Sequence, residues 1–211
     1  MPLVTALRAT RSGGIAVHLD GAYLCTVSEA LLASRRLFKG LELGEAEVAA
    51  LRAEASAERI MGDAYRLLGH RQRSTAELRR RLLDKGHTDE AVAGALERLT
   101  ADGLLDDEAF ARAFVHDKRA AGGWGRTRLE RELGRLEVPG AAVAAALAGE
   151  GEGDELERAL AVLRRRPRPL APYEGDKRRA LAALQRRGFA TEVAYAAVRR
   201  WVDESRDAGR G

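Results

Sequence analysis

An internal repeat constrains this chain more than any other feature of its sequence. Residues 75–99 align without gaps on residues 126–150 and on residues 177–201, at offsets of 51 and 102. Apolar residues recur at matching places of the three blocks: Leu78, Leu129 and Ala180; Leu82, Leu133 and Leu184; Val92, Val143 and Ala194; Leu96, Leu147 and Val198. Such units bury little apolar surface alone, so a fixed period of this length indicates stacked repeats.

Each repeat is predicted to hold three helices, A, B and C. Ser74-Thr75-Ala76-Glu77 has the pattern of a capping box that opens helix B of the first repeat. Gly86 then ends helix B as a C-terminal glycine, and Gly188 takes the same place in the third repeat, with Glu137 between them. A less regular apolar stretch precedes each aligned block and supplies helix A.

The first 27 residues have a different pattern. Short runs rich in Val, Ile, Leu and Thr are separated by Ser12-Gly13-Gly14 and by Asp20-Gly21, and the second is a strong signal for a tight hairpin turn. We therefore predict a three-stranded antiparallel meander. Ser28 is then expected to cap a short helix, followed by a helix over Glu45–Ala55 and another that begins near Ala57.

The predicted fold class is mainly α: an elongated tandem array of three three-helix repeats, about 51 residues each, with a small N-terminal antiparallel β-meander and short helices. The predicted segments are 1–56 for the meander and helices, 57–108 for the first repeat, 109–150 for the second, and 151–211 for the third repeat and C-terminal tail.

Composition limits the setting in which such a chain works. A hydrophobic content of 45% suffices for a core, and no apolar run approaches the roughly 20 residues that span a bilayer. Residues 1–8 lack the apolar stretch of a secretory signal. The single cysteine excludes an internal disulfide and fits a reducing cytosol. We therefore expect a cytoplasmic monomer with no membrane partner.

The sequence gives little support to catalytic or metal-binding chemistry. Cys25 is expected to be a buried structural residue, and the four histidines lack the spacing of zinc ligands. The acidic run 106–108 is interpreted as a helix cap with first-turn acids. Residues 122–125 are interpreted as a linker between helices A and B, with Trp124 as a surface anchor or, by preference, a plug between helices. No enzyme, cofactor or metal is predicted.

Charge is segregated along the chain, although the net charge is only +4. Residues 71–81 carry five arginines and one glutamate, and residues 164–187 carry nine basic and two acidic residues. Residues 150–157 carry five acidic residues and no basic one. Guanidinium groups match phosphates and carboxylates bidentately, so the basic tracts favour an acidic polymer or an acidic protein surface as partner.

Several motifs resemble those of the bacterial RecX family. They are Tyr65-Arg66-Leu67-Leu68, Arg71-Gln72-Arg73-Ser74-Thr75-Ala76-Glu77-Leu78, Leu82, Lys85-Gly86, the junction Gly103-Leu104-Leu105-Asp106-Asp107-Glu108-Ala109-Phe110-Ala111, and Gly125 to Leu133. The resemblance covers about residues 57–201 and is strongest over 64–135. It implies tandem three-helix repeats that lie in the groove of the RecA filament on single-stranded DNA.

The resemblance also implies a function: inhibition of RecA ATP hydrolysis, strand exchange, coprotease action and filament extension, which regulates recombination and the SOS response. The predicted partners are the RecA filament and single- or double-stranded DNA. An alternative hypothesis is a direct nucleic-acid-binding array that acts independently of RecA. The candidate contact residues are arginines of the helix B regions: Arg71, Arg73, Arg79, Arg80, Arg81, Arg126, Arg128, Arg178 and Arg179.

Overall fold

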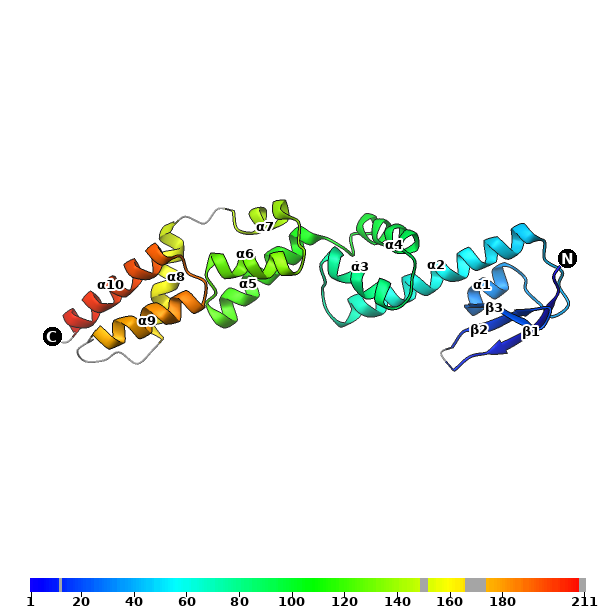
Figure 1. Ribbon diagram of the computed structural model, residues 1–211, viewed down its shortest axis with the longest axis horizontal. Coiled ribbons are helices and arrows are strands. Elements are labelled where there is room, and N and C mark those ends of the chain that lie inside the picture. The colour runs from blue at the N-terminus through cyan, green and yellow to red at the C-terminus, as the bar shows by residue number, and fades with distance from the viewer. Residues whose placement is uncertain (12, 149–151, 166–173, 209–211) are drawn as a thin grey trace. The chain divides into compact units, whose positions relative to one another are not determined.

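The computed structural model describes residues 1–11, 13–148, 152–165 and 174–208 (Figure 1). These residues form the predicted mainly helical fold with a small N-terminal sheet. The chain divides into two compact units, one of Met1–Arg73 with Leu78–Leu104 and one of Ser74–Glu77 with Leu105–Gly211. The four predicted segments and the elongated form of the array stay predictions.

The N-terminal sheet is the predicted antiparallel meander of β1 (Val4–Ala9), β2 (Ile15–Leu19) and β3 (Ala22–Val27), in that order (Figure 1). Asp20 and Gly21 both have positive φ, 47° and 86°, as the Asp-Gly turn requires. One face of the sheet packs against α1 (Glu29–Ser34) and the start of α2 (Glu45–His70). Ser28 caps α1, because its Oγ accepts the Leu31 N–H at 3.0 Å.

Two local predictions in this unit were wrong. The helix over Glu45–Ala55 does not end, and α2 runs unbroken to His70 because residues 53–59 contain no glycine or proline and are mostly good helix formers. The predicted boundary between residues 56 and 57 thus falls inside one helix. Cys25 is half-buried rather than buried, and burial raises the pKa of its thiol.

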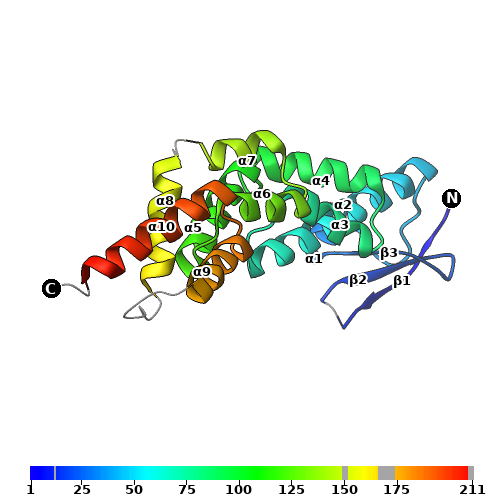
Figure 2. The same ribbon diagram turned by 60° about the vertical axis from the view of Figure 1, so that its left-hand side comes forward.

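The remaining helices follow the predicted order of three per repeat. The first repeat uses the C-terminal part of α2 as helix A, then α3 (Thr75–Asp84) and α4 (Asp89–Ala101). The second consists of α5 (Asp107–Gly122), α6 (Arg126–Arg135) and α7 (Gly140–Ala146). The third consists of α8 (Glu152–Arg164), α9 (Glu174–Arg186) and α10 (Thr191–Ala208), which lie side by side in Figures 1 and 2.

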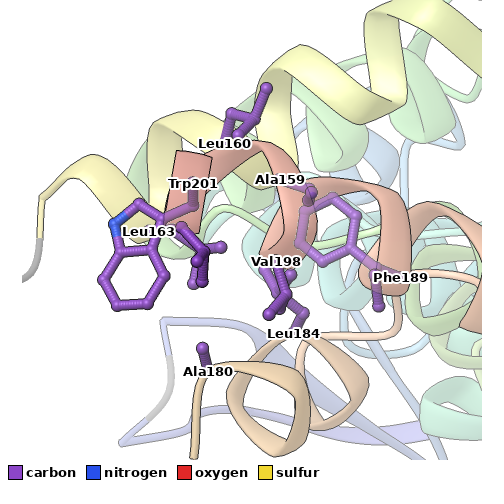
Figure 3. Close-up of a cluster of buried hydrophobic side chains, with 11 residues drawn as sticks. Ala159, Leu160, Leu163, Ala180, Leu184, Phe189, Val198 and Trp201 are labelled. Carbon is purple, nitrogen blue, oxygen red and sulfur yellow. The ribbon is translucent and has the colours of Figure 1, made fainter. Parts of the chain in front are cut away.

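The aligned apolar positions form equivalent cores. Leu82, Leu133 and Leu184 on the three B helices are each fully buried. In the third repeat Leu184 packs with Phe189, Val198 and residues of α8 (Figure 3). At the next aligned position in helix C, Val92 and Ala194 are fully buried and Val143 is half-buried.

The turn between helices B and C keeps one backbone conformation in all three repeats. Gly86, Glu137 and Gly188 occupy the same repeat position and have φ of 84°, 55° and 81°. A left-handed conformation costs a non-glycine residue about 1–2 kcal/mol, because its Cβ crowds the following carbonyl oxygen. The repeat therefore imposes this geometry even where its sequence lacks glycine.

We expect Glu137→Gly to raise the free energy of unfolding by about 1 kcal/mol, because glycine relieves the left-handed strain. Urea denaturation measures the change. The matched control is Arg131→Gly in α6. Because glycine is a poor helix former, this substitution should lower the free energy of unfolding by about 1 kcal/mol. A loss of stability in both variants would show that Glu137 is not strained.

Candidate interaction surface

Helix α3 separates an apolar inner face from a cationic outer face. Leu78 and Leu82 are fully buried, while Arg79, Arg80 and Arg81 are exposed. The Arg79 Nη2 donates to Asp89 Oδ1 at 2.6 Å, which ties this arginine to the start of α4. The Glu77 N–H donates to Ser74 Oγ at 3.2 Å, as in the predicted capping box. These contacts fix α3 so that a short stretch of its surface presents three guanidinium groups.

Two candidate arginines precede α3 and contact main-chain carbonyls. The Arg73 Nε donates to the Leu67 carbonyl at 3.0 Å, and a cation near the C-terminal carbonyls of α2 is favoured by the helix dipole. The Arg71 Nη1 donates to the Gln72 carbonyl at 3.0 Å, and Arg71 is exposed. Arg71 is therefore an exposed cation just before α3, whereas Arg73 is half-buried and contacts the C-terminal part of α2.

The second repeat places its two candidate arginines differently. Arg126 is exposed, and its Nε donates to Glu130 Oε1 at 2.8 Å. Arg128 is half-buried, with its guanidinium carbon 3.8 Å from the centre of the Trp124 ring, a cation–π geometry. Trp124 in turn packs edge-on against Phe114 in the core of the second repeat, so the preferred plug interpretation of Trp124 is confirmed.

In the third repeat, Arg178 and Arg179 are exposed on α9. The Arg179 Nη1 lies 3.7 Å from Asp176 Oδ1, one turn away. Arg164 contacts Glu204 and Glu157 instead of facing solvent freely. Arg166 and Arg168, which belong to the same predicted basic tract, lie outside the described residues, as does the start of the acidic segment 150–157. The binding roles of all nine candidate arginines stay predictions.

The second and third repeats meet through a backbone-to-backbone contact. The Gly125 N–H donates to the Arg187 carbonyl at 2.8 Å, and the Thr127 N–H donates to the Gly188 carbonyl at 3.1 Å. A Cβ on Gly125 would lie 2.4 Å from the Gly188 oxygen, and one on Gly188 would lie 2.3 Å from the Arg128 Cβ. Both positions therefore need glycine for close approach. Residues 123–125 form the predicted linker, since α5 ends at Gly122 and α6 begins at Arg126.

Three carboxylates, which we call the junction carboxylates, occur at nearly equal spacing and bind the N-terminal end of a preceding helix. Glu58 accepts from the Ser28 hydroxyl, Asp107 from the Thr75 N–H and Glu155 from the Arg126 N–H, each at 2.9 Å. First-turn N–H groups have no acceptor within their own helix, and a carboxylate there is also favoured by the helix dipole. We did not identify this role in the sequence, although acids 49 and 48 residues apart were visible there.

Neighbouring acids in the run 106–108 have different roles: one caps its own helix and the next binds another helix. Asp106 caps its own helix by accepting the Ala109 N–H at 2.9 Å, as predicted. Asp107, the next residue, reaches Thr75 on α3 instead. Beside this contact, Ser74 Oγ donates to the Leu136 carbonyl at 2.8 Å. Since 74 and 136 precede 125 and 187 by 51, the two contacts are repeat equivalents.

An ion network around the buried carboxylate of Asp63 holds the turn between α3 and α4 on α2. Asp63 is buried, accepts from His87 Nε2 at 2.9 Å, and lies 3.2 Å from Lys85 Nζ and 3.3 Å from Arg66 Nη1. Burial raises the pKa of the Asp63 carboxyl, but the hydrogen bonds from His87 and Lys85 and the charges of Lys85 and Arg66 outweigh it. The pKa of Asp63 consequently lies below its ordinary value.

Other sites are sparse in the part of the chain that the structure describes. It contains no cluster of three or more His, Cys, Asp or Glu residues able to hold a metal ion. A shallow hollow of about 420 Å³ beside α5 is lined by Arg112, His116 and Arg119 among others. None of the described helices combines the length and apolar character needed to cross a membrane.

Tandem three-helix repeats with arginines on helix B define a protein of the helical-repeat class. The RecX first three-helix domain matches residues 61–99, and the RecX second three-helix domain matches residues 106–147. The chain is 40% identical over 134 residues to Regulatory protein RecX of Xanthomonas axonopodis pv. citri (strain 306), covering 63% of this chain and 82% of the relative. It belongs to the RecX family of regulatory proteins, which confirms the resemblance seen in the sequence.

Further relatives agree with this assignment. Regulatory protein RecX of Mycolicibacterium vanbaalenii is 37% identical over 141 residues, which cover 63% of this chain and 77% of the relative. A crystal structure of regulatory protein RecX covers 97% of this chain and 100% of its own, with a TM-score of 0.64 and 21% identity. The structure of RecX from Lactobacillus salivarius covers 69% of this chain and 96% of its own, with a TM-score of 0.61 and 14% identity. The two structures share the fold.

We expect Gly125→Ala to lower the free energy of unfolding by about 1–3 kcal/mol, because the added methyl group overlaps the Gly188 backbone. Gly134→Ala is the matched control, since Gly134 lies in the same helix with open space around it. At Gly134 alanine should raise the free energy of unfolding by about 1 kcal/mol, because alanine is the better helix former. Thermal or urea unfolding compares the two, and equal effects of the same sign would contradict the close-contact explanation.

Asp63→Asn should destabilise the first unit at pH 7 by about 1–3 kcal/mol, because the buried His87 ring and the Lys85 ammonium lose their carboxylate acceptor. A carboxyl whose pKa is lowered in the folded state stabilises above its unfolded pKa, about 3.9, and loses this effect as pH falls through the folded value. The difference between the unsubstituted protein and the variant should therefore shrink as acid unfolding is followed below about pH 4. A pH-independent difference would exclude this charge effect.

Proposed function

We propose that this RecX-family protein is a non-enzymatic regulator of homologous recombination and of the SOS response. In this proposal, the repeats bind in the groove of the RecA filament on single-stranded DNA. Binding inhibits ATP hydrolysis, strand exchange, coprotease activity and filament extension. The protein acts in the cytoplasm as a monomer.

The observation that carries the proposal is the repetition of an arginine-bearing helix B in a family of regulatory proteins. On α3 the outer face presents Arg79, Arg80 and Arg81, and on α9 it presents Arg178 and Arg179. A filament of identical protomers offers repeated binding sites. Because the repeats are linked in one chain, binding of the first repeat makes binding of the next an intramolecular event, which raises the overall affinity. Each contact can then be weak while the whole protein binds tightly.

Titration of the protein into RecA-catalysed ATP hydrolysis on single-stranded DNA tests the proposal, with DNA binding measured in parallel at two salt concentrations. Inhibition at well below one molecule per RecA protomer is the expected result. Strong DNA binding with a steep salt dependence and no inhibition would instead favour a direct nucleic-acid-binding array.

Charge reversal of Arg79, Arg80 and Arg81 to Glu should weaken inhibition at least about tenfold, because an attractive cationic contact becomes repulsive. The side chains are exposed, so the unfolding temperature should change little. The matched control reverses Arg52, Arg98 and Arg199, which are exposed and have the same summed charge but lie outside the B helices. Equal losses of inhibition in both triple variants would mean that only net charge matters.

A further inference from the structure

The turn between helices B and C is a binding surface in the third repeat. There Arg187 and Gly188 receive the corner between α5 and α6: their carbonyls accept from the N–H groups of Gly125 and Thr127. The Arg187 Nε also donates to the Gly122 carbonyl at 3.3 Å. The turn therefore recognises the C-terminal end of one helix and the first turn of the next, joined by small residues.

The second repeat uses its equivalent turn in a similar way. Its Leu136 carbonyl accepts from the Ser74 hydroxyl at 2.8 Å, at the start of α3. Leu136 and Arg187 are 51 residues apart, so they occupy one repeat position. Two turns of the same geometry thus bind the start of a helix B.

The equivalent turn of the first repeat, Lys85–His87, is open. Lys85 and Gly86 are exposed, and a Cβ added at Gly86 meets nothing within 4 Å, whereas at Gly188 it would meet the Arg128 Cβ. Among the described residues, no main-chain N–H donates to the carbonyls of Lys85 or Gly86. The preceding helix, α1, is bound through Ser28 to Glu58 instead.

This open turn is also held in a fixed conformation. The Gly86 N–H donates to the Leu83 carbonyl at 2.8 Å, and the His87 ring is bound to the buried Asp63. Gly86 has φ of 84°, like Gly188 at 81°. A surface that is already ordered loses little conformational entropy when it binds, which favours its use as a docking site.

We propose that the Lys85–His87 turn docks a helix corner of a partner protein, and the inference rests on the proposed function in taking that partner to be a RecA protomer. The corner presents free first-turn N–H groups to the carbonyls of Lys85 and Gly86. It carries Gly or Ser at the closest approach, as Gly125 and Ser74 do in this chain. The Lys85 ammonium lies 3.2 Å from Asp63 Oδ1, so it holds the turn in place instead of contacting the corner.

The variant Gly86→Asn tests this docking surface. Asn tolerates a left-handed conformation, so the turn is kept while a side chain is added where the partner would approach. Gly103→Asn is the matched control, because Gly103 ends α4 with φ of 70° and has equally open surroundings. Gly86→Asp is a second variant with the same backbone tolerance. Unfolding temperatures of all variants establish that each is folded.

Binding to RecA filaments on single-stranded DNA is then measured by fluorescence anisotropy. Both Gly86 variants should bind at least about tenfold more weakly than the unsubstituted protein, while Gly103→Asn binds normally. Unchanged filament binding by the Gly86 variants would overturn the docking surface and leave the proposed function standing. Failure of the unsubstituted protein to bind or inhibit filaments would overturn both.

Discussion

The first-turn N–H groups of a helix have no acceptor within that helix, and at α3 and α6 this chain satisfies one of them with a carboxylate from later in its sequence. The Arg126 N–H finds Glu155, and the Thr75 N–H finds Asp107. Each of these two bonds also links one three-helix repeat to the next. The same hydrogen bond therefore satisfies a helix end and holds two repeats together. Glu58 makes a related contact at the start of α1, where it accepts from the hydroxyl of the N-cap residue Ser28.

This constraint also explains residues that a core alone would not require. Gly125 and Gly188 are needed because two backbones touch, and Arg128 then packs over the contact with Trp124 beneath it. The left-handed φ of Glu137 follows from the same turn geometry that glycine supplies elsewhere. Helix B is thereby fixed along its inner face and at its N-terminus, which leaves its outer face for arginines.

The sequence predicted much of this fold because the repeat makes local signals agree. Leu82, Leu133 and Leu184 were aligned by sequence and are all buried, and Asp20-Gly21 formed the expected turn. The predicted break near Ala57 failed because a good helix-forming stretch carries no signal for where a repeat begins. The long-range role of Asp107 was missed, because a first-turn acid looks the same whether it binds its own helix or another.

The candidate site could be predicted only as a set of exposed cations. Charge runs identified Arg79, Arg80 and Arg81, which the structure places on the outer face of α3. The same reasoning could not distinguish Arg128, because a guanidinium that packs on Trp124 has the same sequence context as one that faces solvent. That distinction depends on which repeat surfaces meet, and this is set by tertiary contacts.

Amide hydrogen exchange at the start of α6 tests this account most directly. Among the described residues, the N–H groups of Gly125, Arg126 and Thr127 find their acceptors in the third repeat, at Arg187, Glu155 and Gly188. The account predicts that these three amides are protected as strongly as the interior of α6, and that Glu155→Gln selectively reduces protection at Arg126. Exchange of all three at the rate of an unstructured peptide, with the helix interior protected, would contradict it.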